Sequence, residues 1–232
     1  MSSLQHYLFV HTYTSVGMDK INEPVDPDSY RIDINSFDTV EMESSQYERI
    51  DMHIECWNEI QELTKFRLDG PDEKWKQRTV YTAGLHLSDQ SKQTVPIFEV
   101  ALPSSQAFED VTSHDNRHSD NDRSAYTTHL RSLFFKEDLH GRPIGLGPIG
   151  KCFSVSQDQS VILYLDSIDR VPSQAQSVFF EVLDPNPRIQ YGIELQARRE
   201  NLLIFTSTDS TRDRGDVDRK LRSLMGSMIS QD

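Results

Sequence analysis

Residues 151–166, KCFSVSQDQSVILYLD, decide between two fold classes. Two apolar segments, 152–155 and 160–165, flank the polar residues QDQ, a pattern typical of an antiparallel hairpin. Such a hairpin would place Val155 beside Ser160. If residues 161–165 instead ran parallel to the apolar segment 201–206, the chain would need crossover connections and another fold class.

Alternating apolar and polar residues elsewhere favour the antiparallel alternative. Tyr30, Ile32 and Ile34 alternate with polar residues, as do Ile50, Met52 and Ile54. Further hairpins are expected from segments 80–87 with 94–102, and 188–195 with 201–208. Helices are expected at residues 57–66, 126–134, 171–183 and 217–229. We therefore predict an α+β fold, mostly antiparallel β-sheet with a few helices and a single main domain.

The domain organisation predicted from composition has three parts. Residues 1–46 form an acidic N-terminal region, and residues 47–232 form the α+β domain. Within that domain, residues of about 104–124 are polar and predict a mobile loop. The stiff apolar segment 142–150, RPIGLGPIG, is a candidate contact loop through Ile144, Leu146 and Ile149.

Composition excludes several function classes. The 232 residues carry a formal net charge of -13, which disfavours a general nucleic-acid binder, so no direct nucleic-acid binding is expected. The two cysteines, Cys56 and Cys152, are too few for the disulfide framework of a typical secreted domain. We find no signal peptide and no apolar run long enough for a membrane span, and we expect a cytoplasmic protein.

No catalytic, cofactor-binding or metal-binding residue is predicted. His114 and His118 lie in a polar segment without a helical pattern that would bring both to one face. The nucleophile and zinc motifs are absent, and we find no GxxxxGK[ST] phosphate loop. The protein is therefore expected not to be an enzyme and to need no cofactor.

Two segments resemble AAA+ ATPases. SVILYLDSIDRVPSQAQSVFFEVLDP, beginning at Ser160, looks like the Walker B strand and the helix after it, with Asp166 as the Walker B aspartate. LLIFTSTDSTRDRGDVDRKL, beginning at Leu202, looks like the sensor strand and the arginine-finger segment. Ser167 stands where an acidic residue is expected. The resemblance implies a degenerate ATPase-like module.

A second resemblance rests on the order of the expected elements. Residues 48–103 and 142–208 are similar in pattern to the matrix proteins of rhabdoviruses. This implies a self-associating structural protein of the virion and host cytoplasm that bridges a nucleocapsid and a membrane surface. Residues 1–60 depart from that family, because they hold three basic residues against twelve acidic ones.

The function expected first is therefore non-enzymatic: viral matrix-type assembly and budding through protein partners and self-association. The alternatives are a degenerate AAA+ ATPase-like module and an acidic cytosolic adaptor or inhibitor.

Overall fold

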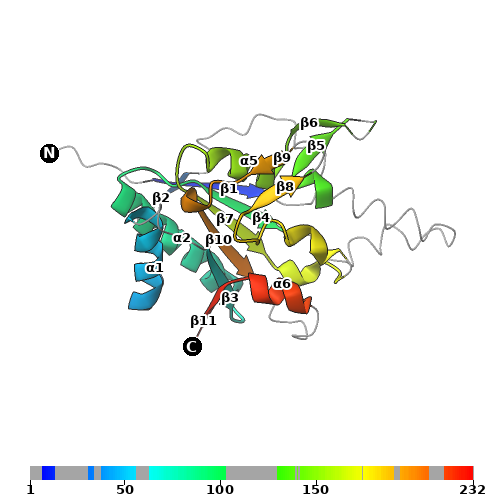
Figure 1. Ribbon diagram of the computed structural model, residues 1–232. Coiled ribbons are helices and arrows are strands. Elements are labelled where there is room, and N and C mark those ends of the chain that lie inside the picture. The colour runs from blue at the N-terminus through cyan, green and yellow to red at the C-terminus, as the bar shows by residue number, and fades with distance from the viewer. Residues whose placement is uncertain are drawn as a thin grey trace.

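A seven-stranded β-sheet forms the centre of the computed structural model (Figure 1), with the strand order β11-β3-β10-β7-β4-β1-β2. The structure describes residues 7–13, 31–33, 38–55, 63–102, 130–138, 140, 142–173, 175–190, 194–208 and 217–231. Six strands run parallel: β1 (Tyr7–Tyr13), β3 (Thr64–Asp69), β4 (Ile97–Ala101), β7 (Val161–Asp166), β10 (Leu202–Ser207) and β11 (Ser227–Ser230). The edge strand β2 (Arg31–Asp33) pairs antiparallel with β1.

The pairing of β7 with β10 determines the fold class. The two strands are parallel neighbours, with Val161 opposite Leu202 and Leu165 opposite Thr206. The prediction of a mostly antiparallel α+β fold is therefore wrong, and the protein has an α/β fold built on a parallel sheet. The expected partner in the hairpin, residues 152–155, belongs to helix α5 (Pro148–Val155). Ile149, Cys152 and Phe153 are buried, at the spacing of one helical face.

Helix α2 (Glu73–Ser91) contains the predicted strand 80–87, which is the second correction. Its buried residues include Val80, Ala83, Gly84 and Leu87, three and four positions apart, so one helical face enters the core. The run of β-branched and aromatic residues around Val80 favoured a strand locally, but packing against the sheet overrides that preference. The predicted strand 94–102 agrees with β4.

Helix α1 (Ser44–Glu55) contains the predicted strand 50–54. Ile50 and His53 are buried, whereas Met52 is 53% exposed. Burial thus follows a helical spacing of three residues and not an alternation of two. The prediction of a helix at residues 57–66 is wrong at its end, because Phe66 lies in β3. Residues 57–62 fall outside the described ranges.

Two hydrophobic layers cover the two faces of the sheet. On one face, α1 and α2 pack on Phe66, Ile97, Ile162, Leu203 and Phe205. On the other, α5, the 3-10 helix η5 (Gln176–Phe179) and α6 (Arg219–Leu224) pack on Val100, Val161, Leu163, Leu165 and Ile204. A strand buried on both faces has an uninterrupted apolar sequence, which explains VILYL in β7.

The remaining elements flank this sheet. The hairpins are β5 (Phe135–Glu137) with β6 (Pro143–Leu146), and β8 (Arg188–Gln190) with β9 (Glu194–Gln196). Short 3-10 helices are η4 (Ile168–Arg170) and η6 (Arg199–Asn201). Three predictions are wrong here. Residues 201–208 pair with β7 and β3 and not with residues 188–195. The segment 171–183 contains 3-10 turns in place of a long helix. The segment 217–229 divides into α6 and β11.

Gly226 produces that division. It adopts a left-handed φ of 87°, and a Cβ placed on it would overlap the carbonyl oxygen of Lys65. Only glycine fits a backbone this close in that conformation. The chain therefore turns sharply after α6 and places β11 against β3.

Two other predictions are not tested by the structure. The loop expected at about 104–124 lies outside the described residues, and the boundary at residue 46 stays a prediction. In the part of the chain that the structure describes, no helix is both long enough and apolar enough to cross a membrane.

Candidate functional site

The junction between β3 and α2 has the layout of a phosphate-binding loop. β3 ends at Asp69, Gly70 and Pro71 form the turn, and α2 begins after Asp72. Residues 70–77 are GPDEKWKQ, in which Gly70 and Lys76 have the spacing of the first glycine and the lysine of GxxxxGK[ST]. Trp75 and Gln77 occupy the positions of the second glycine and of the hydroxyl residue. The sequence analysis missed this junction because it required the complete motif.

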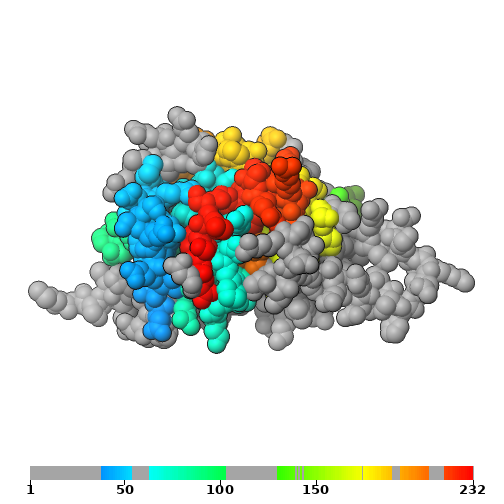
Figure 2. Space-filling model, turned by 90° about the horizontal axis from the view of Figure 1, so that it is seen from below, coloured from blue at the N-terminus to red at the C-terminus, as the bar shows by residue number. Residues whose placement is uncertain are grey.

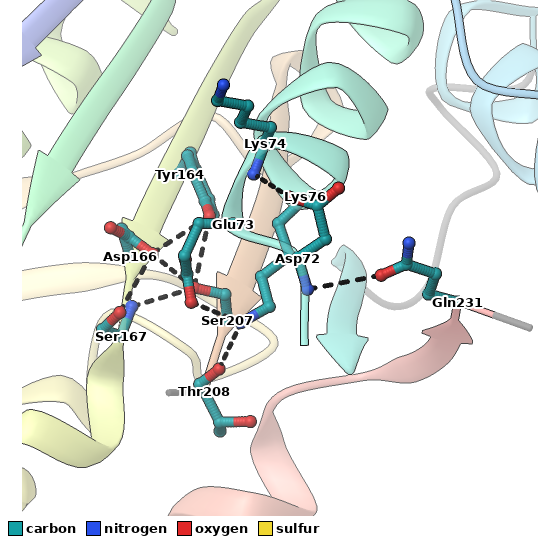
Figure 3. A network of polar contacts seen from close by, with 10 residues as sticks. All are labelled: Asp72, Glu73, Lys74, Lys76, Tyr164, Asp166, Ser167, Ser207, Thr208 and Gln231. Atoms are coloured by element: carbon teal, nitrogen blue, oxygen red, sulfur yellow. Dashed lines mark hydrogen bonds and ion pairs between the residues drawn. The ribbon is translucent and has the colours of Figure 1, made fainter. Parts of the chain in front are cut away.

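Lys76 is the central residue of the junction. Its side chain is fully buried, and its Nζ atom donates to Glu73 Oε1 at 2.8 Å and to the carbonyl oxygen of Thr208 at 2.6 Å (Figure 3). Thr208 directly follows β10, so the lysine joins the start of α2 to the carboxyl end of a central strand. In a phosphate loop this ammonium group reaches a phosphate. Here it binds a carboxylate and a carbonyl of the same chain.

Other groups of the chain occupy the start of α2 as well. Asp72 is the N-cap, and its Oδ1 atom accepts a hydrogen bond from the Lys74 backbone N–H at 2.9 Å. The Asp72 backbone N–H donates to Gln231 Oε1 at 3.3 Å. Helix N-termini bind anions through such N–H groups and through the helix dipole. The carboxylates of Asp72 and Glu73 already supply negative charge at this position.

A second segment, GLGPIGKC at residues 145–152, matches the GxxxxGK part of the motif. Its last position holds Cys152, which is fully buried, in place of the serine or threonine. A phosphate loop joins a strand of the main sheet to the following helix. This segment instead follows β6, which belongs to a separate two-stranded sheet. It therefore lacks the structural context of a phosphate loop.

The turn of this second segment is filled by backbone of the same chain. The Gly147 N–H donates to the Phe134 carbonyl at 2.8 Å, and the Ile149 N–H donates to the Leu133 carbonyl at 2.8 Å. A Cβ placed on Gly147 or Gly150 would overlap these neighbouring carbonyl groups. The glycines thus permit close packing of residues 132–134 on the start of α5.

A polar cluster lies beside Lys76, at the carboxyl ends of β7 and β10. Asp166 Oδ1 lies within hydrogen-bond distance of the hydroxyls of Ser207 (2.7 Å), Tyr164 (3.1 Å) and Ser167 (3.1 Å). The Ser167 backbone N–H donates to Ser207 Oγ at 2.9 Å, and Ser167 is itself held at a left-handed φ of 56°. Figure 3 shows this cluster next to Lys76. Hydroxyl donors of the chain thus surround the Asp166 carboxylate.

A third carboxylate, Glu99 on β4, is buried near the same end of the sheet. Its two oxygens accept from Gln77 Nε2 at 3.0 and 3.2 Å, and one also accepts from the Tyr81 hydroxyl at 3.2 Å. Burial raises the pKa of Tyr81, and the charge of Glu99 raises it further. Burial and the charge of Asp166 likewise raise the pKa of Tyr164. Both phenols therefore stay protonated at neutral pH and remain donors.

The chemistry available at this site follows from its charges. The start of α2 and the strands β4 and β7 contribute four carboxylates to this region, and their negative charge would repel a phosphate chain: Asp72, Glu73, Glu99 and Asp166. The serine or threonine hydroxyl that a phosphate loop offers to a magnesium ion is replaced by the amide of Gln77, whose Nε2 atom donates to Glu99. Among the described residues, no three His, Cys, Asp or Glu side chains are grouped so that they could hold a metal ion.

The contact residues proposed from the sequence lie elsewhere, on β6 and α5. Ile144 is 68% exposed, Leu146 is partly buried against the core, and Ile149 is fully buried. The structure thus separates Ile144 from the other two. Their role in contacts stays a prediction, as does the expected absence of direct nucleic-acid binding.

Comparison with known proteins gives the following results. No model of a protein family matches the sequence. No curated protein matches it either. The chain is similar to solved structures of a Thermotoga maritima RuvB mutant (11% identity, TM-score 0.40), of Brucella abortus NtrX in complex with ATP (12%, 0.47) and of closed-state Hsp104 with ATPγS and FITC casein (10%, 0.47). These matches cover 82%, 84% and 82% of this chain. The chain spans less than half of each of those chains, namely 46%, 38% and 37%.

The resemblance to rhabdovirus matrix proteins is overturned, together with the expected role in a virion. It depended on the order of antiparallel hairpins, and the parallel β7–β10 pair removes two of them. The alternative prediction, an ATPase-like module, agrees better with the parallel sheet.

Proposed function

We propose that this chain is an ATPase-like module that neither binds nor hydrolyses nucleotide and that acts by binding other proteins. One observation carries the proposal. Lys76, at phosphate-loop spacing after a strand of the central sheet, is buried and bound to Glu73 and to the Thr208 carbonyl. A nucleotide would have to displace both partners. Its magnesium ion would also lack the serine or threonine hydroxyl of a phosphate loop, because Gln77 stands at that position and donates to Glu99.

Lys76 and Asp166 have a structural use even in a protein that does not hydrolyse nucleotide. Lys76 joins α2 to β10, and Asp166 joins β7 to β10 through Ser207, so contacts at this end of the sheet stabilise the fold. A buried lysine without a partner would be strongly unfavourable. Glu73 therefore replaces the phosphate as the anion that neutralises Lys76.

The experiment is a titration of the full chain with a fluorescent ATP analogue and magnesium, followed by a phosphate-release assay. We expect no saturable binding up to about 1 mM nucleotide, a limit that corresponds to about 4 kcal/mol of binding free energy. We also expect a release rate that equals the rate without protein. Saturable binding that Lys76→Met or Lys151→Met abolishes, or hydrolysis that Asp166→Asn abolishes, would refute the proposal.

A further inference from the structure

Three large apolar side chains are more than half exposed in the described part of the chain: Met52 on α1, Ile144 on β6 and Met228 on β11. Single exposed apolar residues are common and need no explanation. Two of these three, however, lie in segments whose charges are opposite. Ile144 lies in a basic segment and Met52 in an acidic one.

The basic segment is the β5–β6 hairpin with the start of α5. Residues 130–151 contain four basic residues against two acidic ones, in a chain whose net charge is -13. The basic residues are Arg131, Lys136, Arg142 and Lys151. Partial burial lowers the pKa of Lys151, and the nearby charge of Lys136 lowers it further, so two of these cations lie close together.

The position of Ile144 in this hairpin also favours a contact role. Lys136 pairs with Gly145, whereas the next residue, Glu137, pairs with Pro143, so Ile144 is the extra residue of a β-bulge. Bulges redirect side chains and often occur near functional sites. Ile144 is consequently turned out to 68% exposure, two residues after the exposed Arg142.

The acidic segment comprises residues 38–55, which include α1. It holds six acidic residues and one arginine. Glu41, Glu43 and Glu48 are exposed, and Glu48 and Met52 lie four residues apart, on the same side of the helix. The surface of α1 is visible along one side of the molecule in Figure 2. It therefore presents an apolar side chain bordered by carboxylates.

We infer that the β5–β6 hairpin of one molecule binds the α1 surface of a second copy of this chain. Ile144 and Met52 supply the apolar contact. The cations of the hairpin face the carboxylates of the helix, and the opposite charges favour this pairing over either surface with itself. Figure 1 shows the two surfaces at opposite ends of the molecule. A contact between different surfaces at opposite ends joins molecules head to tail.

The test is sedimentation velocity of the full chain at about 5–200 µM in about 50 mM salt, because a small charged interface binds weakly and is screened by salt. We expect species larger than a monomer that increase with concentration and decrease in about 500 mM salt. Lys136→Glu with Arg142→Glu reverses the hairpin charge, and Glu43→Lys with Glu48→Lys reverses the helix charge. Each double variant alone should weaken association at least tenfold.

Mixing the two double variants is the decisive measurement. The reversed hairpin of one then meets the reversed helix of the other, and the two unreversed surfaces also match, so the mixture should associate like the wild type. A control with the same charge change as the helix variant at exposed sites elsewhere, Asp158→Lys with Glu194→Lys, should leave association within about twofold. The inference is refuted if the wild type stays monomeric, or if the mixture does not recover association. Thermal melts of each variant show whether it is folded.

Discussion

The Nζ atom of Lys76 lies 2.6 Å from the carbonyl oxygen of Thr208, a residue 132 positions further along the chain. Together with the contact to Glu73, this hydrogen bond holds the start of α2 against the end of β10. The two contacts give Lys76 a measurable role in stability.

Lys76→Met should lower the free energy of unfolding by about 3 kcal/mol, because it removes the buried donor of the Thr208 carbonyl and leaves Glu73 without its partner. Glu73→Gln keeps a neutral acceptor and should cost about 1 kcal/mol. Urea unfolding followed by circular dichroism measures both. The control is Lys74→Met, at an exposed position in the same turn, with a change below about 0.5 kcal/mol. Equal stability of Lys76→Met and Lys74→Met would contradict the structural role.

Asp166 and Ser207 should be energetically coupled, since Ser207 donates to Asp166 at 2.7 Å and both lie where β7 and β10 end. Asp166→Ala, Ser207→Ala and the double variant form a thermodynamic cycle. We expect an interaction energy of about 1–2 kcal/mol, typical of a hydrogen bond to a charged group. Additive effects of the two substitutions would show that the contact contributes little.

Stability should fall between pH 7 and pH 4 because of His53. Burial lowers the pKa of His53 from 6.5 to about 4, an effect that the nearby backbone of Asn201 offsets only in part. Below pH 6.5 the unfolded chain therefore binds a proton that the folded protein does not, so unfolding becomes easier as the pH falls. The full effect is about 3 kcal/mol, since one pKa unit corresponds to about 1.4 kcal/mol.

His53→Leu should remove most of this pH dependence. Within the described ranges, neither ring nitrogen of His53 has a hydrogen-bond partner of normal geometry, so leucine loses no such contact. His140→Leu, at an exposed histidine, is the matched control and should keep the wild-type slope. Urea melts at several pH values between 7 and about 4.5, a range that covers most of the shift of this pKa, give the slopes. Identical slopes for wild type and His53→Leu would disprove the assignment.

Gly226→Ala should destabilise the protein by more than about 2 kcal/mol, because alanine is disfavoured at a left-handed φ and its Cβ would meet the Lys65 backbone. Gly145→Ala is the control. A Cβ there would lie 3.8 Å from the nearest atom of Lys136, so we expect a change below about 1 kcal/mol. Differential scanning calorimetry compares the two variants, and similar melting temperatures would show that the turn after α6 is not required.

The sequence predicted individual strands better than their partners. β4, β7 and β10 lie where apolar runs indicated strands, but the run at 80–87 forms part of a helix, because a short apolar run does not by itself distinguish a buried strand from a buried helix. Their parallel pairing could not be obtained from short-range pattern, since β10 lies between β7 and β3, and β3 is far from both along the chain. The helical periodicity of α2 is visible only when its buried residues are known, and the β-branched residues around Val80 concealed it.

The sequence predicted no catalytic residue, and of the candidate site it indicated only Asp166, through the resemblance to a Walker B aspartate. Asp166 was identified from the apolar strand before it, and the structure places it beside Lys76. The β3–α2 junction was missed because Trp75 and Gln77 replace the motif residues. The remaining signal was the spacing of Gly70 and Lys76 after the alternating strand TKFRLD, with an aspartate N-cap between them.

The position of β3 between β10 and β11 has a consequence for biosynthesis. The ribosome makes β3 and α2 well before either neighbour of β3, because β10 begins at Leu202 and β11 at Ser227. Until residues beyond 202 have emerged, β3 exposes two unpaired edges, and Lys76 has no Thr208 to bind. Nascent chains of this protein are therefore exposed to aggregation until β10 and β11 have been made, and chaperone binding to β3 and α2 should end only when these two strands are complete.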